Sequence, residues 1–151
     1  MDNERIRDLC LTFPHVAETL NWGSNLVYWA APRELGGKIF AITDLEPGRC
    51  VLAFHAGQEH FYELLEVESI VPAPHLARAF WVGLERWDAL RPHQIEEELR
   101  RAYELVFARL PKKTRTLLAL PEKERAKLIR ERKQELAAHA QKPAKTSVRK
   151  R

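Results

Sequence analysis

Aromatic rings and cations are the side chains with the clearest capacity for chemistry, and one short stretch combines both. In HLARAFWVGLERW, Arg78 precedes Trp81 by three residues. A guanidinium group binds phosphate or carboxylate, and an indole ring offers a plane on which a base can stack. In a β-strand, Phe80, Val82 and Leu84 would share one face because alternate side chains point the same way. Trp81 would then face the opposite side, where a partner could reach it.

The C-terminal part of the sequence is strongly cationic. Residues 111–151 hold fourteen Lys or Arg and four Asp or Glu, whereas residues 1–110 hold eleven and seventeen. The net charge of +10 on this segment therefore accompanies a net charge of −6 on the rest. Each Lys or Arg near a phosphate releases a condensed counterion, so we expect salt-sensitive binding to a polyanion, largely independent of sequence.

A solvated helix face with internal salt bridges is the alternative for this segment, since Glu124, Glu131 and Glu135 could pair with nearby cations. Residues 136–151 contain no Asp or Glu, which favours the polyanion hypothesis. No helix with base-reading Asn, Gln and Arg stands out, so sequence-specific readout is not expected.

No catalytic motif is present, and we expect a non-enzymatic protein without a cofactor or a small-molecule substrate. The chain has no GxSxG elbow, no Gly-rich phosphate loop and no HExxH pair. His55 and His60 lie near the acidic residues of 59–68, but this spacing is that of a solvent-facing helix stripe. We therefore expect no metal site.

The cysteines and the hydropathy indicate a reducing compartment. Cys10 and Cys50 match no CxxC motif, so both are interpreted as small core residues of a cytoplasmic protein. The absence of a long apolar run argues against a signal peptide and a membrane span.

Hydrophobic periodicity predicts the elements that position these residues. Helical patterns cover 2–13, 58–66 and 92–110, and strand patterns occur in NLVYWAA, KIFAITDL, RCVLAFH, SIVPAP and RAFWVGL. HVAETLNWGS is interpreted as a polar connection, and the Gly36–Gly37 pair as a turn that permits positive φ. The order α-β-β-β-α-β-β-α predicts a single compact α+β domain: a five-stranded antiparallel sheet with helices mainly on one face.

A basic helix is expected to follow this domain, in PEKERAKLIRERKQELAAHAQ, and KPAKTSVRKR after it is expected to be disordered. We divide the chain into an α+β domain at 1–116 and a basic tail at 117–151.

The face of the sheet opposite the helices is predicted to be too apolar to remain exposed to solvent. The residues expected to face the helices are Leu26, Tyr28, Phe40, Ile42, Cys50, Leu52 and Phe54. The residues expected on the opposite face are Val27, Trp29, Ile39, Ala41, Val51, His55 and Trp81. Three explanations remain open. The tail or a symmetric partner chain covers the face, Trp29 and Trp81 form a stacking platform for bases, or the register slips by one residue and exchanges the two faces.

Four stretches together resemble the MmcQ/YjbR family of small bacterial proteins: FPHVAETLNWG, GGKIFAI, VPAPHLARAFWVGL and EELRRAYELVFARLPKK, over roughly residues 4–116. The resemblance implies a compact α+β fold of the kind described as CyaY-like or "double wing". It also implies a DNA-binding role, because family members are commonly labelled so. The polar or aromatic positions that match the family are Lys38, Trp81, Tyr103, Lys112 and Lys113.

We therefore expect a module that binds DNA or another polyanion mainly through its basic C-terminal segment. The candidate nucleic-acid-binding residues are Lys38, Arg78, Trp81, Lys112, Lys113, Arg115, Lys127, Arg130 and Lys133. The alternative function is a protein-interaction or homodimerisation module that uses the aromatic open face of the sheet.

Overall fold

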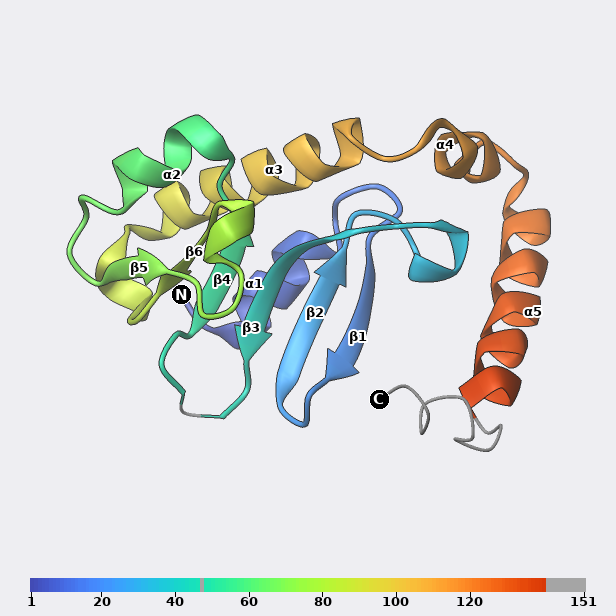
Figure 1. Cartoon of the computed structure of the whole chain (residues 1–151), viewed down its shortest axis with the longest axis horizontal. Helices are drawn as coiled ribbons and strands as arrows, with labels where there is room; N and C mark the ends of the chain where they lie inside the picture. The colour runs from blue at the N-terminus through green and yellow to red at the C-terminus, as the bar shows by residue number, and fades with distance from the viewer. Residues whose placement is uncertain (47, 141–151) are drawn as a thin grey trace, which may run out of the picture.

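An antiparallel sheet forms the centre of the molecule (Figure 1). The computed structural model describes residues 1–46 and 48–140, so the expected disorder of KPAKTSVRKR lies outside the described residues. Six strands follow the order β1-β2-β3-β4-β6-β5, each antiparallel to its neighbours. Their bounds are β1 (Ala17–Asn21), β2 (Asn25–Trp29), β3 (Ile39–Asp44), β4 (Leu52–His55), β5 (Ile70–Pro72) and β6 (Trp81–Leu84).

The described residues also form five α-helices and three short 3-10 helices. Their bounds are α1 (Asn3–Cys10), η1 (Arg33–Leu35), α2 (Gln58–Leu64), η2 (Ala77–Ala79), η3 (Trp87–Ala89), α3 (Pro92–Ala108), α4 (Lys112–Leu118) and α5 (Glu122–Ala140). Helices α1 and α3 lie behind the sheet in Figure 1 and contact each other, and α3 packs on β3 and β4. This arrangement confirms the α+β class. No helix in the described part of the chain is long and apolar enough to cross a bilayer.

The expectation of five strands is wrong, because β1 forms within HVAETLNWGS, the stretch interpreted as a connection. Among the described residues β1 pairs only with β2 and lies at the edge of the sheet, so it needs few apolar residues to be stable. Its residues are half-buried apart from the exposed Leu20. Helix α4 is a second addition to the predicted order, since its seven residues are too short to give a clear periodic signal.

The main core lies between the sheet and helices α1 and α3. The Phe40 ring packs against Phe13 and Tyr103, with centroid distances of 6.2 Å and 5.5 Å. The Tyr103 hydroxyl donates to the Pro14 carbonyl at 2.6 Å and so ties α3 to the loop after α1. Val82 and Leu84 belong to this core as expected. Phe80 packs against the core from outside the strand, at the end of η2, with φ of +64°.

A β-bulge between β2 and β3 changes which residues face the helices. Tyr28 pairs with Ala41 and Trp29 with Ile39, so Phe40 is the extra residue on β3. Beyond the bulge the predicted alternation is inverted, and Ala41 lies in the core while Ile42 lies on the open face.

The predicted faces of Cys50 and Val51, which precede β4, are exchanged as well. Val51 packs against the core, and Cys50 lines a pocket on the open face. The one-residue slip considered from the sequence therefore applies to β3 and to the residues that lead into β4, but not to the whole sheet.

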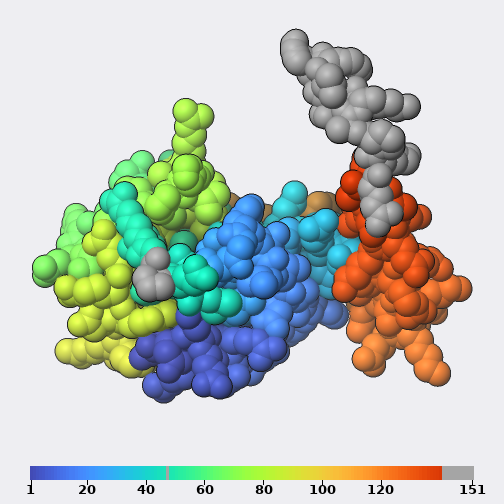
Figure 2. All heavy atoms as spheres, turned by 90° about the horizontal axis from the view of Figure 1, so that it is seen from below, coloured from blue at the N-terminus to red at the C-terminus, as the bar shows by residue number. Residues whose placement is uncertain are grey.

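A second, smaller cluster joins the C-terminal helices to the rest of the molecule. Ala31, Leu35, Leu110 and Leu118 are its buried members, and Leu128 and Ile129 of α5 pack against it. Gly36 next to it has φ of +91°, as expected for this turn, and a Cβ there would collide with Thr114 of α4. Helices α4 and α5 are thereby placed beside η1, and Figure 2 shows α5 as a lobe of its own at one end of the molecule.

Candidate functional site

Trp81 is buried, which corrects its proposed role as an exposed stacking plane. It is only 4% exposed, and its ring stacks on His55 of the neighbouring strand at a centroid distance of 6.0 Å. Its backbone N–H donates to the Leu76 carbonyl at 3.3 Å, because the β5–β6 loop folds over this end of the open face. Trp29 is half-buried, and its indole N–H donates to Thr19 Oγ1 at 2.9 Å. Neither indole is left as a free platform.

His55 serves this packing as a neutral ring. Its Nδ1 accepts from the Gly57 backbone N–H at 3.2 Å, which leaves the ring proton on Nε2. Burial first, and then the charge of Arg109, lower the pKa of His55 below its ordinary value. His60, five residues later, bonds instead to Glu63 and Glu98. His55 and His60 therefore do not converge on one site, and among the described residues no group of three or more His, Cys, Asp or Glu could hold a metal ion.

The eight cationic candidates are all exposed, but they fall into separate places. Lys38 precedes β3, and Arg78 lies in η2 above the sheet, away from α5 (Figure 1). The other six lie on α4 and α5: Lys112, Lys113, Arg115, Lys127, Arg130 and Lys133. The structure thus places the six C-terminal candidates on two consecutive helices that both contact η1, and Arg78 lies on a different element.

Three arginines of this region have backbone carbonyls as partners. Arg115 donates to the carbonyl oxygens of Ala108 and Phe107 at the end of α3. Arg125 donates to the Leu120 carbonyl at 2.6 Å, and Arg132 to the Glu34 carbonyl at 2.8 Å. Cations at the C-terminal ends of helices satisfy carbonyls that have no partner within the helix. Arg115 therefore has a structural role that the sequence did not indicate.

Lys127, Arg130 and Lys133 form a solvent-facing row on α5. Their spacing of three residues keeps them on one exposed side of the helix. Leu128 lies on a different side, whereas Ile129 is one turn from Lys133 and borders the row. Within residues 1–46 and 48–140, no ion pair joins a cation of α4 or α5 to any carboxylate. The internal salt bridges considered from the sequence are therefore not formed here. We call Lys112, Lys113, Lys127, Arg130 and Lys133 the basic surface.

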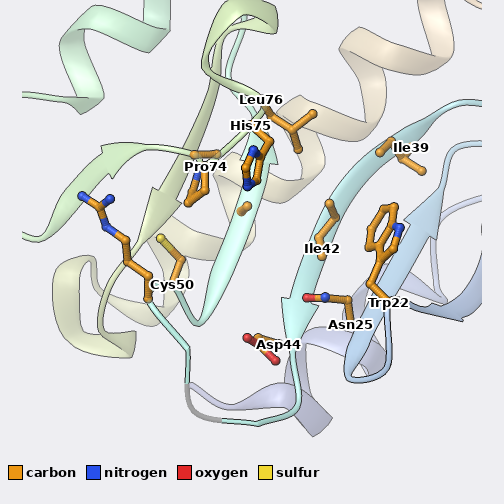
Figure 3. Close-up of a pocket in the computed structure, with 12 residues that line it drawn as sticks. Trp22, Asn25, Ile39, Ile42, Asp44, Cys50, Pro74, His75 and Leu76 are labelled. Carbon is orange, nitrogen blue, oxygen red and sulfur yellow. The ribbon is translucent and has the colours of Figure 1, made fainter. Parts of the chain in front are cut away.

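A pocket of about 510 Å³ lies on the open face of the sheet, and Figure 3 shows its lining. Strands β3 and β4 supply its apolar floor, the β5–β6 loop supplies one wall, and the β1–β2 turn supplies the other. The lining residues are Trp22, Asn25, Ile39, Ile42, Asp44, Arg49, Cys50, Ala53, Ala73, Pro74, His75 and Leu76. The open face is therefore partly covered by the chain's own β5–β6 loop, and no residue of 117–140 lines this pocket.

Sequence reasoning missed Trp22, the most exposed large hydrophobic residue among those described, at 69%. The signal in the sequence was a large aromatic residue directly before Gly23. A side chain at such a turn lies at the surface and is rarely buried. His75 faces the same pocket from a loop more than fifty residues away. Only the strand register brings the two together, and no local pattern reveals it.

Comparison with known proteins supports the architecture. A family model described as YjbR matches residues 11–105. A crystal structure of the Deinococcus radiodurans protein DR2400, with a domain described as DUF419, is similar at a TM-score of 0.67 and 26% identity. That similarity covers 80% of this chain and 90% of the other. No curated protein matches the chain.

Proposed function

The chain belongs to the YjbR family, and from this premise we propose that it is a non-enzymatic module that binds DNA through the basic surface of α4 and α5. The family model ends at residue 105, so the basic surface lies outside the matched residues. Family membership supports the α+β body, and the proposed binding is argued from α4 and α5 themselves.

The observation that carries the proposal is the row of exposed cations on α5, which face solvent without a carboxylate partner in the described chain. A cation already paired inside the protein releases no counterion from DNA, whereas one facing solvent does. The acidic body, at a net charge of −6 over residues 1–110, repels the same polyanion. We propose that DNA meets the molecule at the end where α5 stands out (Figure 2).

Contacts of this kind read the phosphate backbone and not the bases. Lysine is a point charge on a flexible stem, and it positions the protein on the duplex without discriminating between base pairs. We therefore propose binding with little sequence preference. Cys10 and Cys50 are free thiols, which supports the proposed cytoplasmic location.

The alternative function is a protein-interaction or homodimerisation module that uses the aromatic open face of the sheet. Trp81 cannot supply an exposed contact there because it is buried. Trp22 is the aromatic that projects from this face into solvent. Replacement of Trp22 by Ser, followed by a sedimentation measurement of mass, tests this alternative. A fall in mass with unchanged DNA affinity would favour it.

Charge removal from α5 is the experiment that tests the DNA proposal. In the full-length chain, Lys127→Gln, Arg130→Gln and Lys133→Gln together should reduce the slope of log K against log salt by roughly three, at about 0.9 per lost phosphate contact. Fluorescence anisotropy with a labelled duplex at several salt concentrations measures this slope.

The matched control removes the same charge from the body through Arg5→Gln, Arg91→Gln and Arg101→Gln, all at exposed positions without an ion pair to a carboxylate of the described residues. This variant should keep a slope close to that of the unmodified chain. Equal losses in the two triple variants would show that net charge alone drives binding, and the proposed surface would be wrong.

A further inference from the structure

The pocket on the open face has the size and composition of a ligand site. At about 510 Å³ it lies within the range of small-molecule sites, roughly 300–1,000 Å³. Its lining is mostly apolar, with polar side chains near one end. The hollow therefore has room for a small ligand that is apolar on its faces and polar at one edge.

Two residues at the mouth are held in an uncommon backbone conformation. Trp22 has φ of +51° and His75 has φ of +66°, both in the left-handed region that bulky side chains rarely adopt. Trp22 lies in the β1–β2 turn and His75 in the β5–β6 loop, and Figure 3 shows their rings on opposite sides of the pocket. Such conformations cost free energy and persist where the surrounding fold imposes them, often at ligand sites.

The polar end of the pocket combines an amide and a carboxylate. Asn25 and Asp44 face each other across β2 and β3 as register partners. Asp44 Oδ1 accepts from Ser24 Oγ at 2.8 Å and from the Glu46 N–H at 3.1 Å. Asp44 Oδ2 accepts no hydrogen bond from a side chain or backbone N–H in the described residues, and neither does the Asn25 side chain take part in one. Asp44 Oδ2 lies against Gly48 of the β3–β4 loop on one side, and both Asp44 and Asn25 line the pocket, so a ligand N–H can reach them only from the pocket side.

We propose that this pocket binds one unpaired nucleobase, stacked on Trp22 beside His75 with its N–H donors directed at Asp44 and Asn25. A flat heteroaromatic ring satisfies both parts of the site. Its faces cover the indole ring and the apolar floor, and its polar edge meets the carboxylate and the amide. A purely apolar ligand would desolvate Asp44 without replacing the hydrogen bonds to water.

The base can come from a free nucleoside or from a single-stranded nucleic acid, and the inference does not depend on the basic surface of α5. Guanosine is the first probe because its base edge carries two kinds of N–H donor and it has no phosphate to be repelled by Asp44. The expected dissociation constant is on the order of 100 μM for a ligand of this size. Ribose should not bind.

Cys50 provides a readout inside the pocket, and Cys10 provides its internal control. Cys50 is half-buried in the lining, whereas Cys10 is fully buried in the core. Burial raises the pKa of both thiols, so alkylation with iodoacetamide is followed at pH 8.5 and only Cys50 should react. Saturating guanosine should slow the alkylation of Cys50 at least fivefold in the full-length chain.

Substitution of the ring at the mouth distinguishes a site from a nonspecific effect. Trp22→Ala should weaken guanosine binding about tenfold or more, because stacking on an aromatic side chain contributes this much per base. Asp44→Asn should weaken it as well while keeping the acceptor for Ser24. The matched control is Tyr62→Ala, which removes an aromatic ring that is 60% exposed on α2, outside the pocket. It should leave binding unchanged.

The outcomes separate this inference from the DNA proposal. If neither guanosine nor adenosine protects Cys50 at 10 mM, the pocket inference is overturned. If a single-stranded oligonucleotide binds but the Lys127, Arg130 and Lys133 variant abolishes that binding while Cys50 stays unprotected, the basic surface stands and the pocket inference falls. Protection of Cys50 by nucleosides in that same variant would support the pocket alone.

Discussion

His60 is held between two carboxylates, and this geometry fixes its charge. Nδ1 lies 2.8 Å from Glu63 Oε1 and Nε2 lies 2.7 Å from Glu98 Oε2. Both ring nitrogens must donate, so the ring is an imidazolium ion in this arrangement. Burial acts to lower the pKa of His60, but the hydrogen bonds to Glu98 and Glu63 outweigh it and raise the pKa above its ordinary value. The pair also ties α2 to α3.

Stability should therefore fall as pH rises past the pKa of folded His60. Because the pKa is higher in the folded than in the unfolded chain, the stabilisation is complete below about pH 6.5 and is lost above the folded value. Glu98→Gln should lower the free energy of unfolding by about 1.5 kcal/mol at pH 5.5 and much less at pH 8. Urea unfolding at the two pH values measures the difference. Parallel pH profiles for the variant and the unmodified chain would contradict this account.

At the residue scale, the sequence predicted the solvent exposure of the cationic side chains better than that of the aromatic side chains. The exposure of Lys112, Lys127 and Arg130 follows from their charge, since unpaired cations are almost never buried. Trp81 was misplaced because its environment depends on a loop that folds back over the sheet. Alternation within a strand tells which face a side chain takes, but not what covers that face.

At the scale of elements, η1 and α4 form the joint that carries α5. Leu35 is 2% exposed and packs with Leu110 and Leu118. Leu35→Ala should cost about 3 kcal/mol through lost burial and the cavity left behind. Hydrogen exchange should accelerate in α4 and α5 while β3 and α3 keep their protection.

Leu136→Ala is the matched control on α5, because Leu136 is 42% exposed. It should change stability by less than about 0.5 kcal/mol. If Leu35→Ala instead accelerates exchange uniformly, the C-terminal helices and the body unfold as one unit. A chain cut after Leu110 would uncover the same joint, so charge substitutions test the DNA proposal more cleanly than truncation does.

Within residues 1–46 and 48–140, periodicity predicted every strand except β1 and every α-helix except α4. β1 escaped because an edge strand with one neighbour tolerates residues such as Glu18 and Asn21, which resemble a loop. The bulge at Phe40 could not be anticipated, since both registers satisfy the alternation and only the packing of Phe40 against Tyr103 selects one. The pocket depends on that register, so it could not be predicted from the sequence either.

At the scale of the whole molecule, charge is divided between the two ends. The N-terminal end of α3, with exposed Glu96 and Glu97, lies at the end of the molecule opposite α5 (Figure 1). At 0.15 M salt, charges are screened over about 8 Å. Glu96→Gln with Glu97→Gln should therefore change DNA affinity less than about twofold.

The same loss of two negative charges on α5, through Glu131→Gln and Glu135→Gln, should raise DNA affinity at least about fivefold. Anisotropy titrations at 0.15 M salt compare the two double variants. Equal gains would mean that DNA approaches the molecule without a preferred side.

The two borders of the sheet are unequal, and this governs how the protein can join to copies of itself when concentrated. β5 is three residues long and ends in Pro72, which has no N–H to offer an incoming strand. β1 is five residues long, with Leu20 62% exposed and Glu18 bridged to Arg7 at 2.7 Å. We therefore expect intermolecular strand pairing at high concentration to begin at β1, and we expect loss of the Glu18 charge to favour it.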